Sequence, residues 1–124
     1  MSLKNFKKII LRPFGFNFIA RYVDDNPTSE SIEDGEIVIV GSRSYQKWAY
    51  LKCPCGCGNT TMLSLSTKRR PSWSVHLNWM MIPTVYPSVR DVGSCYAHYW
   101  IKKGKIHWCR DTGIRYTEEN DSED

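Results

Sequence analysis

The chain has 124 residues, 41% of them hydrophobic and 24% charged, which is ordinary usage for one globular domain. This composition excludes collagen, coiled coil and wholesale disorder, and no apolar run approaches the roughly 20 residues that a membrane helix needs. The 17 lysines and arginines outnumber 13 acidic residues, but five acidic residues lie within residues 117–124. Residues 1–116 therefore carry a net charge of +9, and we expect one domain followed by a disordered acidic tail.

The first half of the chain predicts short strands. Residues 14–22 alternate partly and are rich in aromatic side chains, which favours a strand. Residues 24–35 contain Pro, Ser, Asp and Gly and predict a loop or a short helical turn. The β-branched run at 36–40 predicts a buried strand ended by Gly41, and residues 45–52 predict a strand that leads into a cysteine-rich segment.

Two alternating segments follow this cysteine-rich stretch. Residues 60–66 predict a strand with Met62 and either Leu63 or Leu65 facing the interior. Residues 73–79 alternate with period two and predict another strand.

The C-terminal part of the chain predicts a hairpin. A short strand is expected at 83–86, and the strands at 96–102 and 105–109 are joined across Lys103 and Gly104. A glycine at the second turn position is typical of a tight type I′ turn. The sequence therefore predicts a mostly β protein, a small single domain of short antiparallel strands around a core of Trp and Tyr side chains.

The strongest local signal is the cysteine-rich segment at 53–58, in which three cysteines alternate with Pro and Gly and a glycine follows. A second half lies downstream at Cys95 and His98. Zinc prefers four tetrahedral N or S ligands from two short loops, so these segments predict a zinc knuckle. An all-thiolate site would use Cys53, Cys55, Cys57 and Cys95.

Alternatives to this ligand set remain open. One alternative omits Cys53 and uses His98, and Cys109 is expected to be a small core residue. An iron–sulfur cluster or a redox C-x-C pair are minor rivals, because the spacing differs from the usual cluster motifs. No secretory signal pattern precedes Arg12, so we expect a cytoplasmic protein with reduced thiols, which favours metal over disulfides.

A longer series of motifs occurs in order along the chain. Its members are Trp48-Ala49, Leu51-Lys52, the cysteine-rich segment at 53–58, Pro71, Trp73, Pro87-Ser88-Val89, Cys95, His98-Tyr99-Trp100-Ile101, Gly104 and Trp108-Cys109-Arg110. The series resembles the domain-of-unknown-function family 6527 over residues 36–112. The resemblance implies a small zinc-bound peptidase that processes or removes a ubiquitin-like protein, with E1-like and E2-like proteins as further partners. This chain has Ala97 where that family commonly has a serine, so a nucleophile at that position would be lost.

A hydrolase of this kind needs a nucleophile and a base. If zinc takes four thiolates, His98 is free to act as the base, and Ser88, held by Pro87, is the candidate nucleophile. Asp91 is the acidic residue nearest in sequence that could orient the histidine. Alternatively, Ser88 caps a turn and His98 binds zinc.

Other chemistry and other classes of function are also compatible with these residues. Zinc held by three ligands could activate water, and a knuckle thiol could be the nucleophile, although a zinc-bound thiolate is occupied. His76 is expected to be a surface or half-buried packing residue, and His107 is expected to face away from its two neighbours. The non-enzymatic alternative is a zinc-binding module for a ubiquitin-like protein or, less favoured, for nucleic acid, held by basic and aromatic side chains.

Overall fold

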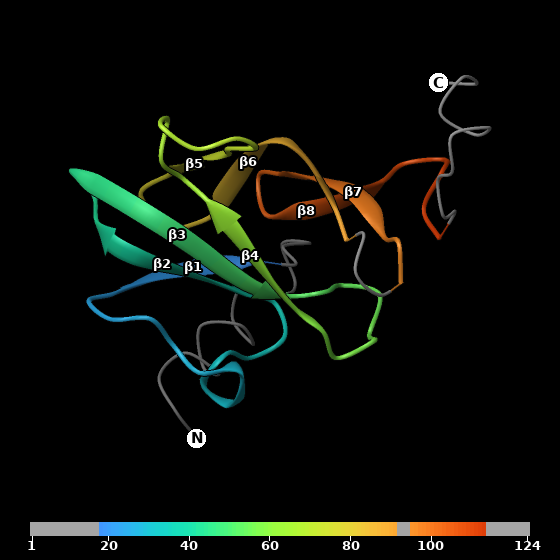
Figure 1. Ribbon diagram of the computed structural model, residues 1–124, viewed down its shortest axis with the longest axis horizontal. Coiled ribbons are helices and arrows are strands. Elements are labelled where there is room, and N and C mark those ends of the chain that lie inside the picture. Colours follow the sequence, from blue (N-terminus) through green and yellow to red (C-terminus); the bar gives the residue numbers. More distant parts are fainter. Residues whose placement is uncertain (1–17, 92–94, 114–124) are drawn as a thin grey trace.

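The computed structural model describes residues 18–91 and 95–113, whose regular secondary structure is almost entirely β-strand (Figure 1). The strands are β1 (Ile19–Val23), β2 (Glu36–Ser42), β3 (Tyr45–Lys52), β4 (Thr60–Ser64), β5 (Ser74–Leu77), β6 (Pro83–Arg90), β7 (His98–Lys102) and β8 (Lys105–Trp108). A short 3-10 helix, η2 (Ser29–Ser31), lies between β1 and β2. The mostly β class is confirmed.

Some predictions fall on other parts of the chain. Residues 14–17 of the first predicted strand and the acidic segment 117–124 lie outside the described residues. Within the described ranges, no helix is both long and apolar enough to cross a membrane.

The strands form two four-stranded sheets, with the orders β1-β2-β3-β4 and β5-β6-β7-β8. All neighbouring pairs are antiparallel except β1 and β2, so the antiparallel prediction is wrong for that pair. The connection through η2 returns the chain to the start of β1, which makes the two strands run the same way. Arg21 helps to fix this return, because its Nε lies 3.0 Å from Glu36 Oε2 and its Nη2 donates to the Ser31 carbonyl.

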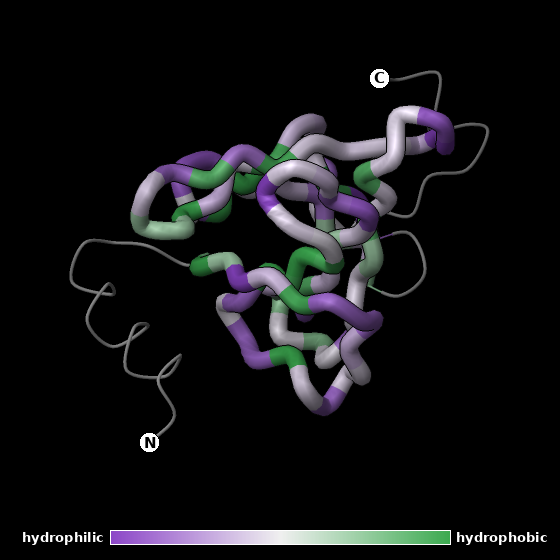
Figure 2. Tube along the Cα trace, turned by 90° about the vertical axis from the view of Figure 1, so that its left-hand side faces the viewer, coloured by the Kyte–Doolittle hydropathy of each residue, from purple (hydrophilic) through white to green (hydrophobic). Residues whose placement is uncertain are grey.

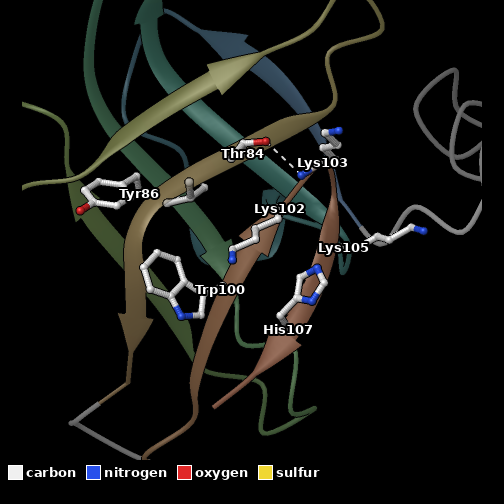
Figure 3. Close-up of a pocket in the computed structure, with 8 residues that line it drawn as sticks. Thr84, Tyr86, Trp100, Lys102, Lys103, Lys105 and His107 are labelled. Carbon is white, nitrogen blue, oxygen red and sulfur yellow. Dashed lines mark hydrogen bonds between the residues drawn. The ribbon is translucent and has the colours of Figure 1, made fainter.

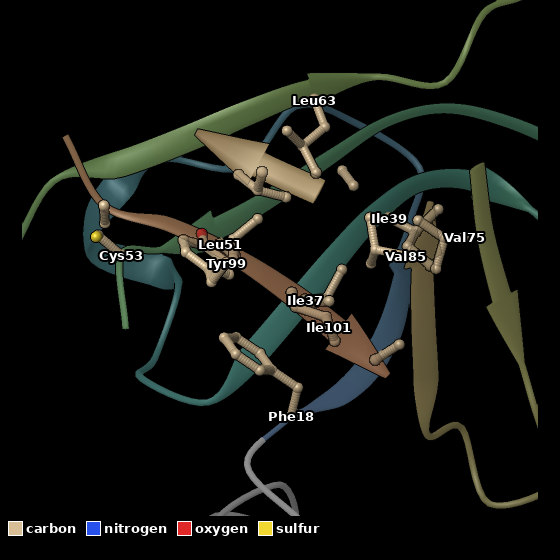
Figure 4. Packing of buried hydrophobic residues seen from close by; sticks show 14 residues of the cluster. Phe18, Ile37, Ile39, Leu51, Cys53, Leu63, Val75, Val85, Tyr99 and Ile101 are labelled. Atoms are coloured by element: carbon tan, nitrogen blue, oxygen red, sulfur yellow. The ribbon is translucent and has the colours of Figure 1, made fainter. Parts of the chain in front are cut away.

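The two sheets share one hydrophobic core (Figure 4). The first sheet contributes inward-facing residues such as Ile37, Ile39 and Leu51, and the second contributes Val85 and Ile101, all almost fully buried. Figure 2 shows hydrophobic stretches toward the middle of the molecule and hydrophilic stretches in the outer loops. Burial of these side chains between the sheets is the main force that holds the two sheets together.

The prediction of a core of Trp and Tyr side chains is wrong for the tryptophans, although the partly buried Trp73 packs against the core. None of the five tryptophans, all within the described residues, is buried, and Trp79 is 86% exposed. The reason is strand alternation: Trp100 is flanked by the buried Tyr99 and Ile101, so its own side chain must point outward. Tyr99 is the large aromatic residue that this alternation leaves in the core.

The inward orientation predicted for Met62 is also wrong. Met62 pairs with Tyr50 on the outer face and is 51% exposed, whereas Leu63 pairs with the buried Ala49 and is 1% exposed. Neighbouring residues of a strand point to opposite faces, so only one of Met62 and Leu63 can face the core, and it is Leu63.

The predicted β7–β8 hairpin is present. Lys103 and Gly104 both have positive φ, 50° and 76°, as a type I′ turn requires. The Lys103 amide also donates to Thr84 Oγ1 at 2.9 Å, and Gly104 N–H donates to the Pro83 carbonyl at 2.7 Å. These bonds tie the turn to β6 and fix the register of the hairpin.

Candidate active site and metal centre

A bulge in β6 positions Ser88. Val85 pairs with Ile101 and Val89 pairs with Tyr99, so the three residues between them on β6 face only Trp100 on β7. Such extra residues leave the ladder and re-aim a side chain. The Trp73 indole Nε1 donates to the Ser88 carbonyl oxygen at 3.2 Å and holds the bulge from the other side.

Ser88 and His98 meet on the outer face of the second sheet. Ser88 Oγ lies 2.9 Å from His98 Nε2, and both side chains are half-buried. On the other side of the imidazole, Nδ1 lies 2.6 Å from Asp111 Oδ1. With its proton on Nδ1, the ring donates to Asp111 and accepts from the Ser88 hydroxyl, which is the arrangement that allows a histidine to act as a base.

Hydrogen bonds hold the segment that contains Asp111 against the beginning of β7, where His98 lies. The Cys109 amide donates to the His98 carbonyl at 2.9 Å, and the Thr112 hydroxyl donates to the same carbonyl while accepting from the His98 amide. Gly113 N–H donates to the Tyr96 carbonyl at 2.8 Å. The segment after β8 is therefore fastened along the beginning of β7, and this places the Asp111 carboxylate beside His98.

Asp111 was not identified from the sequence, and the choice of Asp91 as orienting acid is wrong. The carboxylate that contacts His98 is that of Asp111, whereas Asp91 is 6% exposed and accepts from Asn59 Nδ2 at 3.2 and 3.4 Å. Asp91 ties the loop after the cysteine-rich turn to the segment before β7. The missed signal was the hairpin register: Tyr99 pairs with Trp108, so residues just after β8 lie beside the beginning of β7.

Arg90 is a further residue of the site that sequence reasoning did not find. Its Nη2 lies 2.5 Å from Asp111 Oδ2 and 3.0 Å from His98 Nδ1. The guanidinium and the carboxylate form a charge-assisted hydrogen bond. Arg90 thus fixes the carboxylate that fixes the histidine.

Ala97 lies on the other face of the strand region. It is 1% exposed and belongs to the core, whereas His98 points outward. A serine at position 97 would therefore point into the core, away from Ser88 and His98, and its absence removes nothing from this site.

Four cysteine thiols converge at the opposite end of β7 from the hairpin turn. Cys53, Cys55 and Cys57 come from the turn after β3, and Cys95 comes from the segment before β7. Their Sγ atoms lie within 4.8 Å of one another, and four of the separations are 3.3 Å (Cys53–Cys55), 3.4 Å (Cys53–Cys95), 3.3 Å (Cys55–Cys95) and 3.8 Å (Cys57–Cys95). Positive φ at Gly56 and Gly58 allows the tight turn.

The donor set fits one metal ion. Ligand sulfurs of a tetrahedral zinc site, with bonds of about 2.3 Å, lie about 3.8 Å apart, close to the separations found here. Burial raises the pKa of the Cys53 thiol, so a thiolate at this position needs a compensating cation. The cluster could hold a metal ion and would then link the two sheets.

His98 does not belong to this cluster. It forms a second group of potential ligands with Cys109 and Asp111. The 2.6 Å between Nδ1 and Oδ1 is a hydrogen-bond distance, whereas two ligands of one zinc ion lie about 3.3 Å apart. Burial, and to a smaller extent Asp111, raises the pKa of the Cys109 thiol, which keeps it protonated and a poor nucleophile.

The remaining histidines lie elsewhere on the surface. His76 is exposed on β5, as expected. His107 is exposed on β8 and, as expected, points away from the half-buried Ile106, although Trp108 is also 49% exposed.

The chain is similar to one known protein family. Residues 22–109 match the family described as bacterial ubiquitination-like system serine protease (BubE). The chain belongs to the BubE family. The BubE match includes Ser88 and His98, and Asp111 lies just after its last residue. The match supports the expected link to a ubiquitin-like system but does not confirm the predicted family name, domain-of-unknown-function family 6527. No curated protein and no solved structure matches the chain.

Proposed function

We propose that this BubE-family chain is a serine hydrolase that cleaves after the C-terminal glycine of a bacterial ubiquitin-like protein. Ser88 is the nucleophile, His98 the general base and Asp111 the residue that orients the base. The observation that carries this proposal is the continuous hydrogen-bonded series from Ser88 Oγ through His98 to Asp111 Oδ1. The family description, a serine protease of a ubiquitination-like system, supports it.

The chemistry follows from this series. His98 Nε2 takes the hydroxyl proton as Ser88 Oγ attacks the carbonyl carbon, and Asp111 stabilises the imidazolium that forms. His98 then returns the proton to the leaving amine or alcohol, and an acyl group remains on Ser88. Water, deprotonated by His98, attacks this ester and releases the ubiquitin-like protein with a free carboxylate. The same steps cleave esters as well as amides.

Zinc is the metal that we propose for the four cysteines. Four thiolates complete its tetrahedral coordination, so the ion would supply structural stability in linking the two sheets. The site residues lie close to this link, because Cys95 precedes His98 by three positions. We further propose that residues 1–116 act as one domain, that the protein works in the cytoplasm, and that E1-like and E2-like proteins of the same system are its other partners.

The function is tested with a ubiquitin-like protein from the same system, extended by several residues past its terminal glycine. Wild-type protein should release the extension, and Ser88→Ala and His98→Ala should not, while both variants keep the metal content and unfolding temperature of the wild type. If Ser88→Ala cleaves as fast as the wild type, the proposed nucleophile is wrong. If His98→Ala loses metal and unfolds, His98 is a ligand and the proposed base is wrong.

A further inference from the structure

The outer face of β6, β7 and β8 has an open pocket of about 680 Å³ (Figure 3). Seven of its eight lining residues lie at outward positions on these strands or on the turn between β7 and β8, and the eighth, Val85, is a buried residue of β6. The eight are Thr84, Val85, Tyr86, Trp100, Lys102, Lys103, Lys105 and His107. We call this feature the β7–β8 pocket.

The β7–β8 pocket lies on the same face of β7 as His98. His98, Trp100 and Lys102 alternate with the buried Tyr99 and Ile101, so all three point to the same face of β7. Alternate residues of a strand are about 7 Å apart, so Trp100 lies one such step from His98 and Lys102 two steps. An extended polypeptide lying along this face would place about four residues between Ser88 and the hairpin turn.

The chemistry of the β7–β8 pocket combines an aromatic floor with a cationic end. The rings of Tyr86 and Trp100 lie 5.9 Å apart, and Lys102 Nζ lies 5.1 Å from the Trp100 ring centroid. Figure 3 shows Tyr86 and Trp100 on neighbouring strands, with Lys102 beside Trp100 and His107 on the next strand. None of the eight lining residues is acidic.

The lysines of the pocket lie close enough to repel one another when no ligand is bound. Lys102 and Lys105 are directly opposite each other in the β7–β8 ladder, and Lys103 lies between them in the turn. Like charges directly opposite on neighbouring strands are destabilising. Within residues 18–91 and 95–113, no acidic side chain forms an ion pair with these lysines. An anionic ligand would relieve this repulsion.

From this placement we propose that the β7–β8 pocket binds an acidic, extended segment of the substrate polypeptide, adjacent to the bond that Ser88 attacks. The inference rests on the proposed function, since it takes Ser88 as the point from which the segment extends. Tyr86 and Trp100 would contact the peptide backbone, and Lys102 and Lys105 would attract its carboxylates. The pocket would thus select substrates with acidic residues within about four positions of the cleaved bond.

Direct binding tests the proposal independently of cleavage. The probe is a labelled twelve-residue peptide with two central glycines and Glu residues on both sides, compared with the same peptide carrying Gln. In the Ser88→Ala protein at low salt, the Glu peptide should bind about tenfold more tightly than the Gln peptide, because a few exposed charge pairs supply that difference. The difference should fall as the salt concentration rises.

Variants locate the binding surface. Lys102→Glu/Lys105→Glu should abolish the preference for the Glu peptide, and Lys102→Arg/Lys105→Arg should keep it. Arg43→Glu/Lys47→Glu makes the same change of charge at exposed positions of the β2–β3 turn and of β3, and should also keep the preference. Circular dichroism and metal content confirm that each variant folds.

Several results would overturn the proposal. Equal binding of the two peptides, no binding of either, or an unchanged preference in Lys102→Glu/Lys105→Glu contradicts it. Tighter binding of a single-stranded oligonucleotide at the same lysines would assign the surface to nucleic acid. If the Glu peptide binds only after residues 117–124 are deleted, the pocket belongs to the acidic tail of the chain. Cleavage by Ser88→Ala would refute the proposed nucleophile, whereas the peptide-binding results would still decide whether the pocket binds acidic segments.

Discussion

The Asp111 carboxylate lies 2.6 Å from His98 Nδ1, although 13 positions separate the two residues in the chain. The β7–β8 hairpin accounts for this proximity, because it returns the chain to the beginning of β7 and places Asp111 beside the histidine. The orientation of the proposed base therefore depends on the type I′ turn at Lys103 and Gly104 at the far end of the hairpin.

Asp111→Asn should lower kcat by roughly 10²- to 10⁴-fold, because the amide would favour the wrong tautomer of His98 and would not stabilise an imidazolium. The rate of cleavage of an ester substrate under saturating conditions measures this effect. Asp91→Asn is the matched control, and it should retain most of kcat while lowering the unfolding temperature. Equal loss of kcat in both variants would refute the assignment of Asp111.

Trp73→Phe should reduce kcat several-fold with little change in KM. It keeps an aromatic ring but removes the indole N–H that donates to the Ser88 carbonyl, so the bulge that aims Ser88 becomes less constrained. Trp79→Phe, at a position that is 86% exposed, should have no effect on either constant. Identical kinetics for Trp73→Phe and wild type would show that this hydrogen bond does not position Ser88.

Metal removal should unfold the protein or greatly lower its unfolding temperature. We expect one zinc ion per chain by elemental analysis, with Cys95→Ser losing the ion and Cys109→Ser retaining it. The reason is that Cys95 lies within the four-thiol cluster and connects the second sheet to it, whereas Cys109 does not. Equal zinc content in the two variants would contradict the ligand set.

Tyr99→Phe should leave stability near neutral pH unchanged or slightly higher, and should make it less sensitive to alkali. Burial raises the pKa of Tyr99 above its ordinary value, so the folded state keeps the proton when the unfolded state begins to lose it near pH 10. Stability is then lost as the pH rises above about 10, by at most about 1.4 kcal/mol per pH unit. Urea unfolding at pH 8 and pH 11 for the two proteins measures the difference, and equal alkaline losses would contradict this account.

Local patterns in the sequence located the strands and the cysteine cluster, although β6 continues to Arg90 beyond the predicted end at 86. The cysteine-rich turn carries its own backbone constraints in Gly56 and Gly58, and the Lys103-Gly104 turn signals a hairpin directly. The position of Leu63 rather than Met62 in the core depends on which strand face meets the second sheet, and that is a long-range property. The same holds for the parallel pairing of β1 with β2.

The proposed catalytic residues also divide into those that local sequence indicates and those that depend on long-range structure. Ser88 and His98 could be selected by chemistry and by the motifs around them, but Asp111 becomes visible only when the hairpin register is followed past the end of β8. Choosing Asp91 by nearness in sequence failed because its carboxylate points toward Asn59. Arg90 gives no sequence signal of its own, since its role arises from contact with Asp111.

Covalent labelling tests the central claim most directly. The protein is treated with diisopropyl fluorophosphate, which reacts with activated serines, and the adduct is located by peptide mass spectrometry. We predict one adduct per chain on Ser88, and no adduct in His98→Ala that retains its fold and metal. An adduct on a different residue, or undiminished labelling of Ser88 in His98→Ala, would contradict the proposed nucleophile and base.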